Sequence, residues 1–261
     1  MRNPFIVRPG ERPCPVQIIV SYFVVCVLII GFFWISLAQV GVVLDFSFVS
    51  QYQVRIVDGL LLTIQISLWS LVISLAIGLP VAAGQGSRIL PVRYLCDVYV
   101  KLMRGTPLLA QIYLFFYIVG TAWGVENRVV AGIIILSIFS GAYIAEIVRG
   151  SLNSLDASQL EAARAVGFTR RQTLRYVVVP QLVSRTLPAL TGQLASMVKD
   201  SSLLSAIAVI ELTQTMQEIS AATFNLFGTY LFLAGVYLAL TLPIMFVSRY
   251  FERKLDYAHA A

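Results

Sequence analysis

The amino-acid sequence predicts an all-α, polytopic membrane protein with six transmembrane helices. Three observations lead to this prediction: the composition, a series of long uncharged stretches, and the distribution of basic residues. Of the 261 residues, 58% are hydrophobic and only 12% are charged, and the mean hydropathy is +0.83. Soluble domains contain about 25% charged residues. The composition therefore excludes a water-soluble enzyme, and it also excludes an intrinsically disordered chain, which combines low hydrophobicity with high charge.

The uncharged stretches set the number of helices. Five ranges contain no Asp, Glu, Lys or Arg: 13–44, 59–87, 105–125, 129–145 and 219–248. A transmembrane helix needs about 20 largely apolar residues. A further stretch, 186–210, qualifies apart from Lys199 and Asp200. We therefore expect helices near residues 17–43, 57–85, 100–121, 128–148, 187–210 and 228–249.

Two of these helices have further informative features, namely the length of the first and the start of the third. The helix expected at 17–43 is too long for a signal peptide, and no small-residue cleavage site follows it, so we interpret it as a membrane anchor. The residues Arg104-Gly105-Thr106-Pro107 are expected to open the third helix, because proline suits a first helical turn.

The basic residues predict the orientation. If the N-terminus lies inside, 16 of the 19 Lys and Arg residues fall on the cytoplasmic side, as the positive-inside rule requires. Both termini are then cytoplasmic. The net charge of +6 is explained by this topology, so we expect contact with membrane lipid and no nucleic-acid partner.

The longest connection, 149–185, lies on the cytoplasmic side and carries helix signals of its own. Asp156 and Gln159 resemble a capping box, and Thr169 and Gln172 form a second one. Between them, Gly167 can adopt the left-handed conformation that ends a helix. We expect a helix, a glycine hinge and a second helix, which Pro180 should stop.

Two roles for this segment stay open from its residues alone. The small side chains of Ala162 and Ala163 would let a partner protein approach closely. The arginines of the same segment would equally suit an amphipathic helix that rests on anionic lipid head groups.

The run EAARAVGFTRRQTLRYVVVP, residues 161–180, resembles the EAA loop of permease subunits of ATP-binding cassette importers. The family pattern has Glu-Ala-Ala, a glycine six residues after the glutamate, and a proline thirteen residues beyond the glycine. The matching positions are Glu161, Ala162, Ala163, Gly167 and Pro180. Val177 and Val179 stand where the family more often has Ile and Leu. The resemblance implies a coupling helix that docks in a groove of an ATPase subunit.

Four further motifs resemble the polar amino-acid uptake branch of these permeases, the histidine, glutamine and arginine type. They are DGLLLTIQISLWSLVISLAIGLPVA (58–82), YVKLMRGTPLLAQIYLFFY (99–117), SGAYIAEIVRGSL (140–152) and KDSSLLSAIAVIEL (199–212). The similarity covers about residues 57–255. It implies the type I importer permease fold, a five-helix core whose N-terminus lies outside, to which this chain adds one N-terminal helix.

The resemblance also implies the partners and the location. A second permease subunit, identical or different, two ATP-binding subunits and an extracytoplasmic amino-acid-binding protein would complete the importer in the bacterial cytoplasmic (inner) membrane. ATP and Mg²⁺ would bind the ATPase, and this chain would bind no cofactor. We expect residues 1–56 to form the extra helix and its linker, residues 57–250 the importer domain with the coupling loop 149–185, and residues 251–261 a cytoplasmic tail.

The sequence gives little support for catalysis. The single histidine, His259, lies in the tail, and the chain has no phosphate-binding loop of the form G-x-x-x-x-G-K-[ST]. The cysteines, Cys14, Cys26 and Cys96, lack metal-ligand spacing. We therefore expect a transport subunit that is not an enzyme and holds no metal.

Polar residues on the expected helices are candidates for the translocation path. They are Arg104, Thr106, Gln111, Ser137, Ser140, Tyr143, Lys199, Asp200, Ser201 and Ser202. A charge at the bilayer centre costs at least ~2.5–3.5 kcal/mol, so Lys199 and Asp200 should face a cavity or a partner.

Each candidate has an alternative. Lys199 and Asp200 could form a structural ion pair, Arg104 could start a helix, and the uncharged groups could hydrogen-bond neighbouring helices. Near the cytoplasmic end of the fourth helix, Glu146 and Arg149 are expected to form a local salt bridge. The rival function is an ion-coupled secondary transporter that uses Glu146 together with the charges at 199 and 200.

Overall fold

The computed structural model describes residues 14–41 and 44–257, with side chains described as far as residue 251. Every regular element within these ranges is helical, and no strand occurs among them. The all-α prediction is therefore confirmed. The chain divides into two compact units, Met1–Asp45 and Phe46–Ala261.

The first unit contributes one helix, α1 (Pro15–Val40). It begins at a proline, whose missing N–H is tolerated in a first helical turn, and its backbone is capped at Gly41. No side chain of α1 is buried within the chain, and the helix is long and apolar enough to cross a membrane. The helix expected at 17–43 is thus present: it begins two residues earlier and ends at Val40, and the expected residues 42–43 lie outside the described part of the chain.

The second unit is built on two long helices, α3 (Gln53–Gln85) and α6 (Arg128–Asn153), and the short α2 (Ser47–Gln51) precedes them. The two long helices pack closely where each has a glycine. A Cβ atom at Gly78 would lie 2.8 Å from the carbonyl oxygen of Gly141, and one at Gly141 would lie 2.9 Å from Ile77. Any larger side chain would separate the helices, so these glycines set the distance between α3 and α6.

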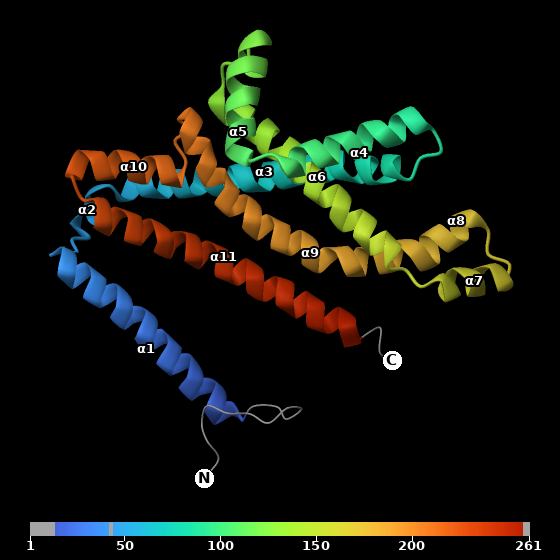
Figure 1. Cartoon of the computed structure of the whole chain (residues 1–261), viewed down its shortest axis with the longest axis horizontal. Helices are drawn as coiled ribbons and strands as arrows, with labels where there is room; N and C mark the ends of the chain where they lie inside the picture. The colour runs from blue at the N-terminus through green and yellow to red at the C-terminus, as the bar shows by residue number, and fades with distance from the viewer. Residues whose placement is uncertain (1–13, 42–43, 258–261) are drawn as a thin grey trace. The chain divides into compact units, whose positions relative to one another are not determined.

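The third expected helix, 100–121, is wrong as a single helix. The chain forms α4 (Leu90–Gly105), then α5 (Leu108–Tyr113) and a π-helix, η1 (Leu114–Gly120), and the two parts are bent by 111°. Pro107 causes the break, because it disfavours helical geometry in the residue before it, and Thr106 is extended with φ −121° and ψ 148°. In Figure 1, α4 runs back along α3, whereas α5 leads away from both.

Pro180 does not stop the helix in which it lies, contrary to expectation. After α7 (Ala157–Ala165), the chain forms α8 (Arg170–Thr173), a π-helix, η2 (Leu174–Val178), and α9 (Val179–Asp200) as successive helical segments. A proline ring crowds the preceding turn of an α-helix. The π turns immediately before Pro180 are wider, and they accommodate the ring. Figure 1 shows α7 and α8 as a pair beyond the end of α6.

The fifth expected helix, 187–210, has different ends in the structure. It begins earlier, as α9, and after Asp200 it changes to a 3₁₀-helix, η3 (Ser201–Ile207). α10 (Leu212–Thr223) and α11 (Leu226–Tyr257) follow, and the helix expected at 228–249 lies within α11. A buried apolar cluster joins α10 to α2, α3 and α11.

The number of spans depends on the two bent helices. In the described ranges, α1, α3, α6 and α11 are each long and apolar enough to cross a membrane. Two bent pairs, Leu90–Gly105 with Leu108–Gly120 and Arg170–Ile207 with Leu212–Thr223, raise the number to six if each pair crosses once. The expected six spans correspond to that arrangement.

Candidate functional site

The α7–α8 segment (residues 157–178) contains the helix, glycine and helix that its sequence predicts. Gly167 has a left-handed φ of +80°. Its N–H donates to the carbonyl oxygen of Arg164 at 3.0 Å, and the N–H of Phe168 donates to that of Ala163 at 3.0 Å. These two bonds form a Schellman motif, which satisfies the last carbonyl groups of α7 and turns the chain sharply.

Only one of the two expected capping boxes forms. Thr169 caps α8, since its Oγ1 accepts from the N–H of Gln172 while Gln172 accepts from the N–H of Thr169 at 2.8 Å. Asp156 occupies the N-cap position of α7, but its side chain makes no capping hydrogen bond. The expected partner, Gln159, instead accepts a hydrogen bond from the side chain of Gln181 on α9. The prediction of a capping box at Asp156 and Gln159 is therefore wrong, because the side chain of Gln159 bonds to another helix.

The motif residues of α7 divide into exposed and buried positions. Glu161 and Ala162 are exposed, whereas Ala163 is 5% exposed. Glu161 forms no ion pair with any residue that the structure describes. Glu161 and Ala162 are thus accessible beside the Schellman turn at Gly167.

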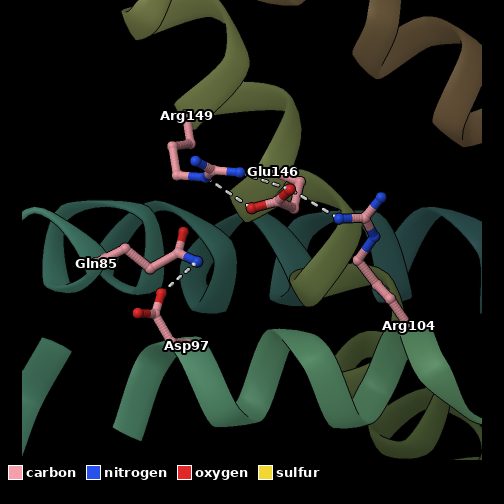
Figure 2. Close-up of polar contacts among 5 residues, drawn as sticks. All are labelled: Gln85, Asp97, Arg104, Glu146 and Arg149. Atoms are coloured by element: carbon pink, nitrogen blue, oxygen red, sulfur yellow. Dashed lines mark hydrogen bonds and ion pairs between the residues drawn. The ribbon is translucent and has the colours of Figure 1, made fainter. Parts of the chain in front are cut away.

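A cluster of charged side chains lies between α3, α4 and α6 (Figure 2). Glu146 accepts from Arg149 at 2.7 and 2.9 Å, which confirms the expected local salt bridge. It also accepts from Arg104 at 2.8 Å. The guanidinium of Arg104 lies 5.4 Å from the centre of the Tyr143 ring, within the range of a cation–π interaction. The structure therefore brings together two of the candidate path residues, Arg104 and Tyr143.

The same cluster lines a pocket of about 260 Å³, hereafter the charged pocket. Besides Arg104, Glu146 and Arg149, it is lined by Gln85, Asp97, Val100 and Lys101. Gln85 donates to Asp97 at 3.1 Å (Figure 2). Acidic and basic groups thus face one space, which can pair both ends of a zwitterion. Asp97 and Lys101 were not among the expected site residues, although their spacing of four residues places them on one helix face.

Thr106 and Gln111 hold the bend between α4 and α5. The amide nitrogen of Gln111 donates to the carbonyl oxygen of Met103 at 2.8 Å and to the hydroxyl of Thr106 at 2.7 Å. Gln111 is 3% exposed. These two side chains satisfy backbone groups that the break at Pro107 leaves without helical partners.

Ser137 and Ser140 are fully buried on α6 and do not line the charged pocket. Ser137 donates to the carbonyl oxygen of Ile133. The hydroxyl of Ser140 has no hydrogen-bond partner in the described part of the chain.

Lys199, Asp200, Ser201 and Ser202 lie where α9 becomes the 3₁₀-helix η3. Lys199 is exposed and Asp200 is half-buried. No ion pair joins either of them to another described residue, so the structural ion pair is not observed within this chain. Ser201 is buried and donates to Val198, whereas Ser202 donates to the carbonyl oxygen of Lys199 at 2.6 Å.

A buried carboxylate, Glu211, was not among the expected site residues. This residue is 0% exposed and caps α10 by accepting from the N–H groups of Thr213 and Gln214, both at 2.9 Å. It also accepts from the hydroxyl of Tyr237 on α11 at 3.0 Å, and Thr63 on α3 lies 3.4 Å away. The sequence signal was an acidic residue that ends an apolar run three positions before Gln214.

Comparison with known proteins identifies the family. The family described as "Binding-protein-dependent transport system inner membrane component" matches residues 74–257. The chain belongs to this family. It is therefore the transmembrane permease subunit of an ATP-binding cassette transporter and a multi-pass protein of the inner membrane. Family membership supports ATP-driven transport and gives no support to the ion-coupled alternative.

Relatives and a solved structure agree with this assignment. The permease is 34% identical to the glutamine transport system permease protein GlnP of Escherichia coli (strain K12), over 77% of this chain and 92% of that protein. It is 33% identical to the L-cystine transport system permease protein TcyB of Bacillus subtilis (strain 168), over 76% and 85% of the two chains. It matches the crystal structure of an amino acid ABC transporter with histidines at a TM-score of 0.76 and 33% identity, over 82% of this chain and all of that one.

Proposed function

We propose that the permease imports polar amino acids, and that it acts with a second permease subunit, two ATP-binding subunits and an extracytoplasmic amino-acid-binding protein. The observation that carries this proposal is the Schellman turn at Gly167, which presents the exposed Glu161 and Ala162 beside a sharp reversal of the chain. The substrate class is supported by the relatives named for glutamine and L-cystine transport.

In the proposed cycle, ATP and Mg²⁺ bind the ATPase subunits, and this chain holds no cofactor. Closure of the ATPase dimer moves α7 and the turn that follows it, with Glu161, Ala162 and Gly167 in contact with the ATPase, while the buried Ala163 packs α7 against the rest of the chain. Gln159 bonds to Gln181 on α9, so this movement passes to the helix that begins around Pro180. That helix ends at Asp200, and its displacement would open the path outward.

The path itself is proposed in two parts. The charged pocket, with Arg104 held against the ring of Tyr143, is suited to the ammonium and carboxylate groups of an amino acid. Thr106 and Gln111 hold the bend between α4 and α5 beside it. Lys199, Asp200 and Ser202 would face the second subunit and form a gate, with the buried Ser201 behind them. Ser137 and Ser140 would support the path from within α6.

The proposed topology has both termini in the cytoplasm and six spans. Residues 1–56 supply the extra helix and its linker, residues 57–250 the importer domain with the coupling loop 149–185, and residues 251–261 a tail. This topology follows the basic residues, 16 of 19 of which then lie inside.

Reconstitution tests the function. The permease is purified with its ATP-binding subunits and placed in vesicles, and uptake of radiolabelled glutamine, cystine and histidine is measured with the binding protein outside. Uptake should require ATP and the binding protein. Uptake that an ion gradient drives without ATP would overturn the proposal.

A further inference from the structure

A second pocket, of about 600 Å³, lies beside the α7–α8 segment and is lined by basic and apolar side chains. Three of its residues are arginines: Arg88, from the turn between α3 and α4, Arg164 from α7, and Arg170 from α8. Leu160, Phe168 and Leu174 supply apolar surface. This space, hereafter the arginine pocket, joins parts of the chain more than 70 residues apart in sequence.

The arginines of this pocket have no acidic partner in the part of the chain that the structure describes. Arg55, Arg104 and Arg149 each form an ion pair with a glutamate in the structure. Arg88, Arg164 and Arg170 form none with any described residue. Three like charges around one space repel each other unless an anion lies between them. A phosphate group suits such a site, since guanidinium groups bind phosphate oxygens in pairs.

The position of Arg88 indicates the source of the phosphate. It follows α3, a helix long enough to cross the membrane, by three residues. The next two side chains, Ile89 and Leu90, are 63% and 55% exposed. Basic residues next to apolar ones at the end of a span lie at the depth of lipid head groups, where each basic residue contributes about 1 kcal/mol of attraction to anionic lipid.

We propose that the arginine pocket binds the phosphate group of an anionic membrane lipid. Arg88, Arg164 and Arg170 surround the phosphate, and Phe168 and Leu174 contact the glycerol and the upper part of the acyl chains. The bound lipid then links the α7–α8 segment to the end of α3. The proposal rests on the membrane placement of α3 in the proposed topology, and it leaves the ATPase contact free, because Glu161 and Ala162 do not line the pocket.

Native mass spectrometry of the full chain in detergent, titrated with phosphatidylglycerol, tests this proposal. The R164Q/R170Q variant should lose at least tenfold in affinity for the most tightly bound lipid. The matched control is R171Q/R175Q, which removes two exposed arginines of the α7–α8 segment that do not line the pocket; it should change the affinity less than twofold. Arg88→Gln, in the turn between α3 and α4, should also weaken binding, and it separates lipid binding from folding of the α7–α8 segment.

Three outcomes would overturn the proposal. Equal losses in R164Q/R170Q and R171Q/R175Q would indicate attraction to general positive charge. Equal affinity for phosphatidylcholine would contradict an anion site. Displacement of the lipid by inorganic phosphate at a comparable concentration would assign the pocket to free phosphate. Because the measurement involves neither the ATPase nor transport, failure of the proposed function would not change its result.

Discussion

The side chain of Gln181, on α9, donates a hydrogen bond to the side chain of Gln159, on α7, 22 residues earlier in the chain. Close by in sequence, Arg185 donates to the hydroxyl of Ser154 at 2.7 Å, beyond the end of α6. These bonds hold both ends of the α6–α7 connection to one helix. The position of α7 therefore depends on α9, and a force on α7 reaches α9 directly.

The first prediction concerns the Gln159–Gln181 bond. Gln159→Leu keeps the side-chain size but removes the acceptor, and a neutral hydrogen bond contributes about 0.5–1.5 kcal/mol. ATP-driven uptake should fall about three- to tenfold in reconstituted vesicles while ATP hydrolysis continues. Gln181→Leu should behave alike, and the double variant should be no worse than either single one. Ser158→Ala, an exposed neighbour on α7, serves as the control. Additive losses in the double variant would contradict the link.

The second prediction concerns the left-handed backbone at Gly167. Gly167→Ala places a Cβ at φ +80°, which costs roughly 1–2 kcal/mol. The Schellman turn should loosen, so uptake per ATP hydrolysed should fall about five- to thirtyfold. Gly150→Ala is the matched control, because Gly150 lies inside α6, where an added Cβ would point into open space. If uptake per ATP hydrolysed is the same in the two variants, the turn at Gly167 is not needed to couple ATP hydrolysis to transport.

Prolines show how far the sequence predicts the helices. Pro107 and Pro180 both lie in apolar helical patterns, yet the first breaks its helix by 111° and the second is accommodated by π turns. The difference depends on the surroundings. Gln111 satisfies the backbone at the first break, whereas the second proline follows turns that can widen. The uncharged stretches were sufficient for α1, α3, α6 and α11, although α3 and α11 each contain an interior proline, Pro80 and Pro243, that does not end the helix.

The contacts of the candidate functional site were likewise predictable from the sequence only where the partners are close along the chain. Glu146 and Arg149 are one helical turn apart, so their spacing alone predicts the salt bridge. Arg104 reaches the same carboxylate from 42 residues away, and no periodicity of the sequence contains that contact. Glu211 was missed for a related reason, because its partners Thr63 and Tyr237 come from two other helices.

The third prediction concerns Glu146 in the charged pocket. Glu146→Gln removes the carboxylate that holds Arg104 and Arg149, and it removes the partner for a substrate ammonium group. Uptake should fall at least tenfold. Complex yield should change little, since partly exposed ion pairs contribute about 0.2–1 kcal/mol. Glu218→Gln, which breaks the ion pair with Arg55 outside the pocket, is the control. A loss of complex yield that parallels the loss of uptake would show that Glu146 has a structural role.

The last prediction concerns Asp200, half-buried at the end of α9. Its neighbour Lys199 is exposed, and neither residue has an ion-pair partner among the described residues. Charges this expensive to place in lipid need a cavity or a partner subunit. Asp200→Asn keeps the shape and removes the charge, so transport rate or substrate preference should change more than complex yield. A structural ion pair with Lys199 predicts the reverse: poor yield for Asp200→Asn and Lys199→Met, and recovery with normal uptake in the double variant. Measuring complex yield and amino-acid uptake for the three variants decides between a gate and a structural ion pair. Recovery of both yield and uptake in the double variant would rule out the gate.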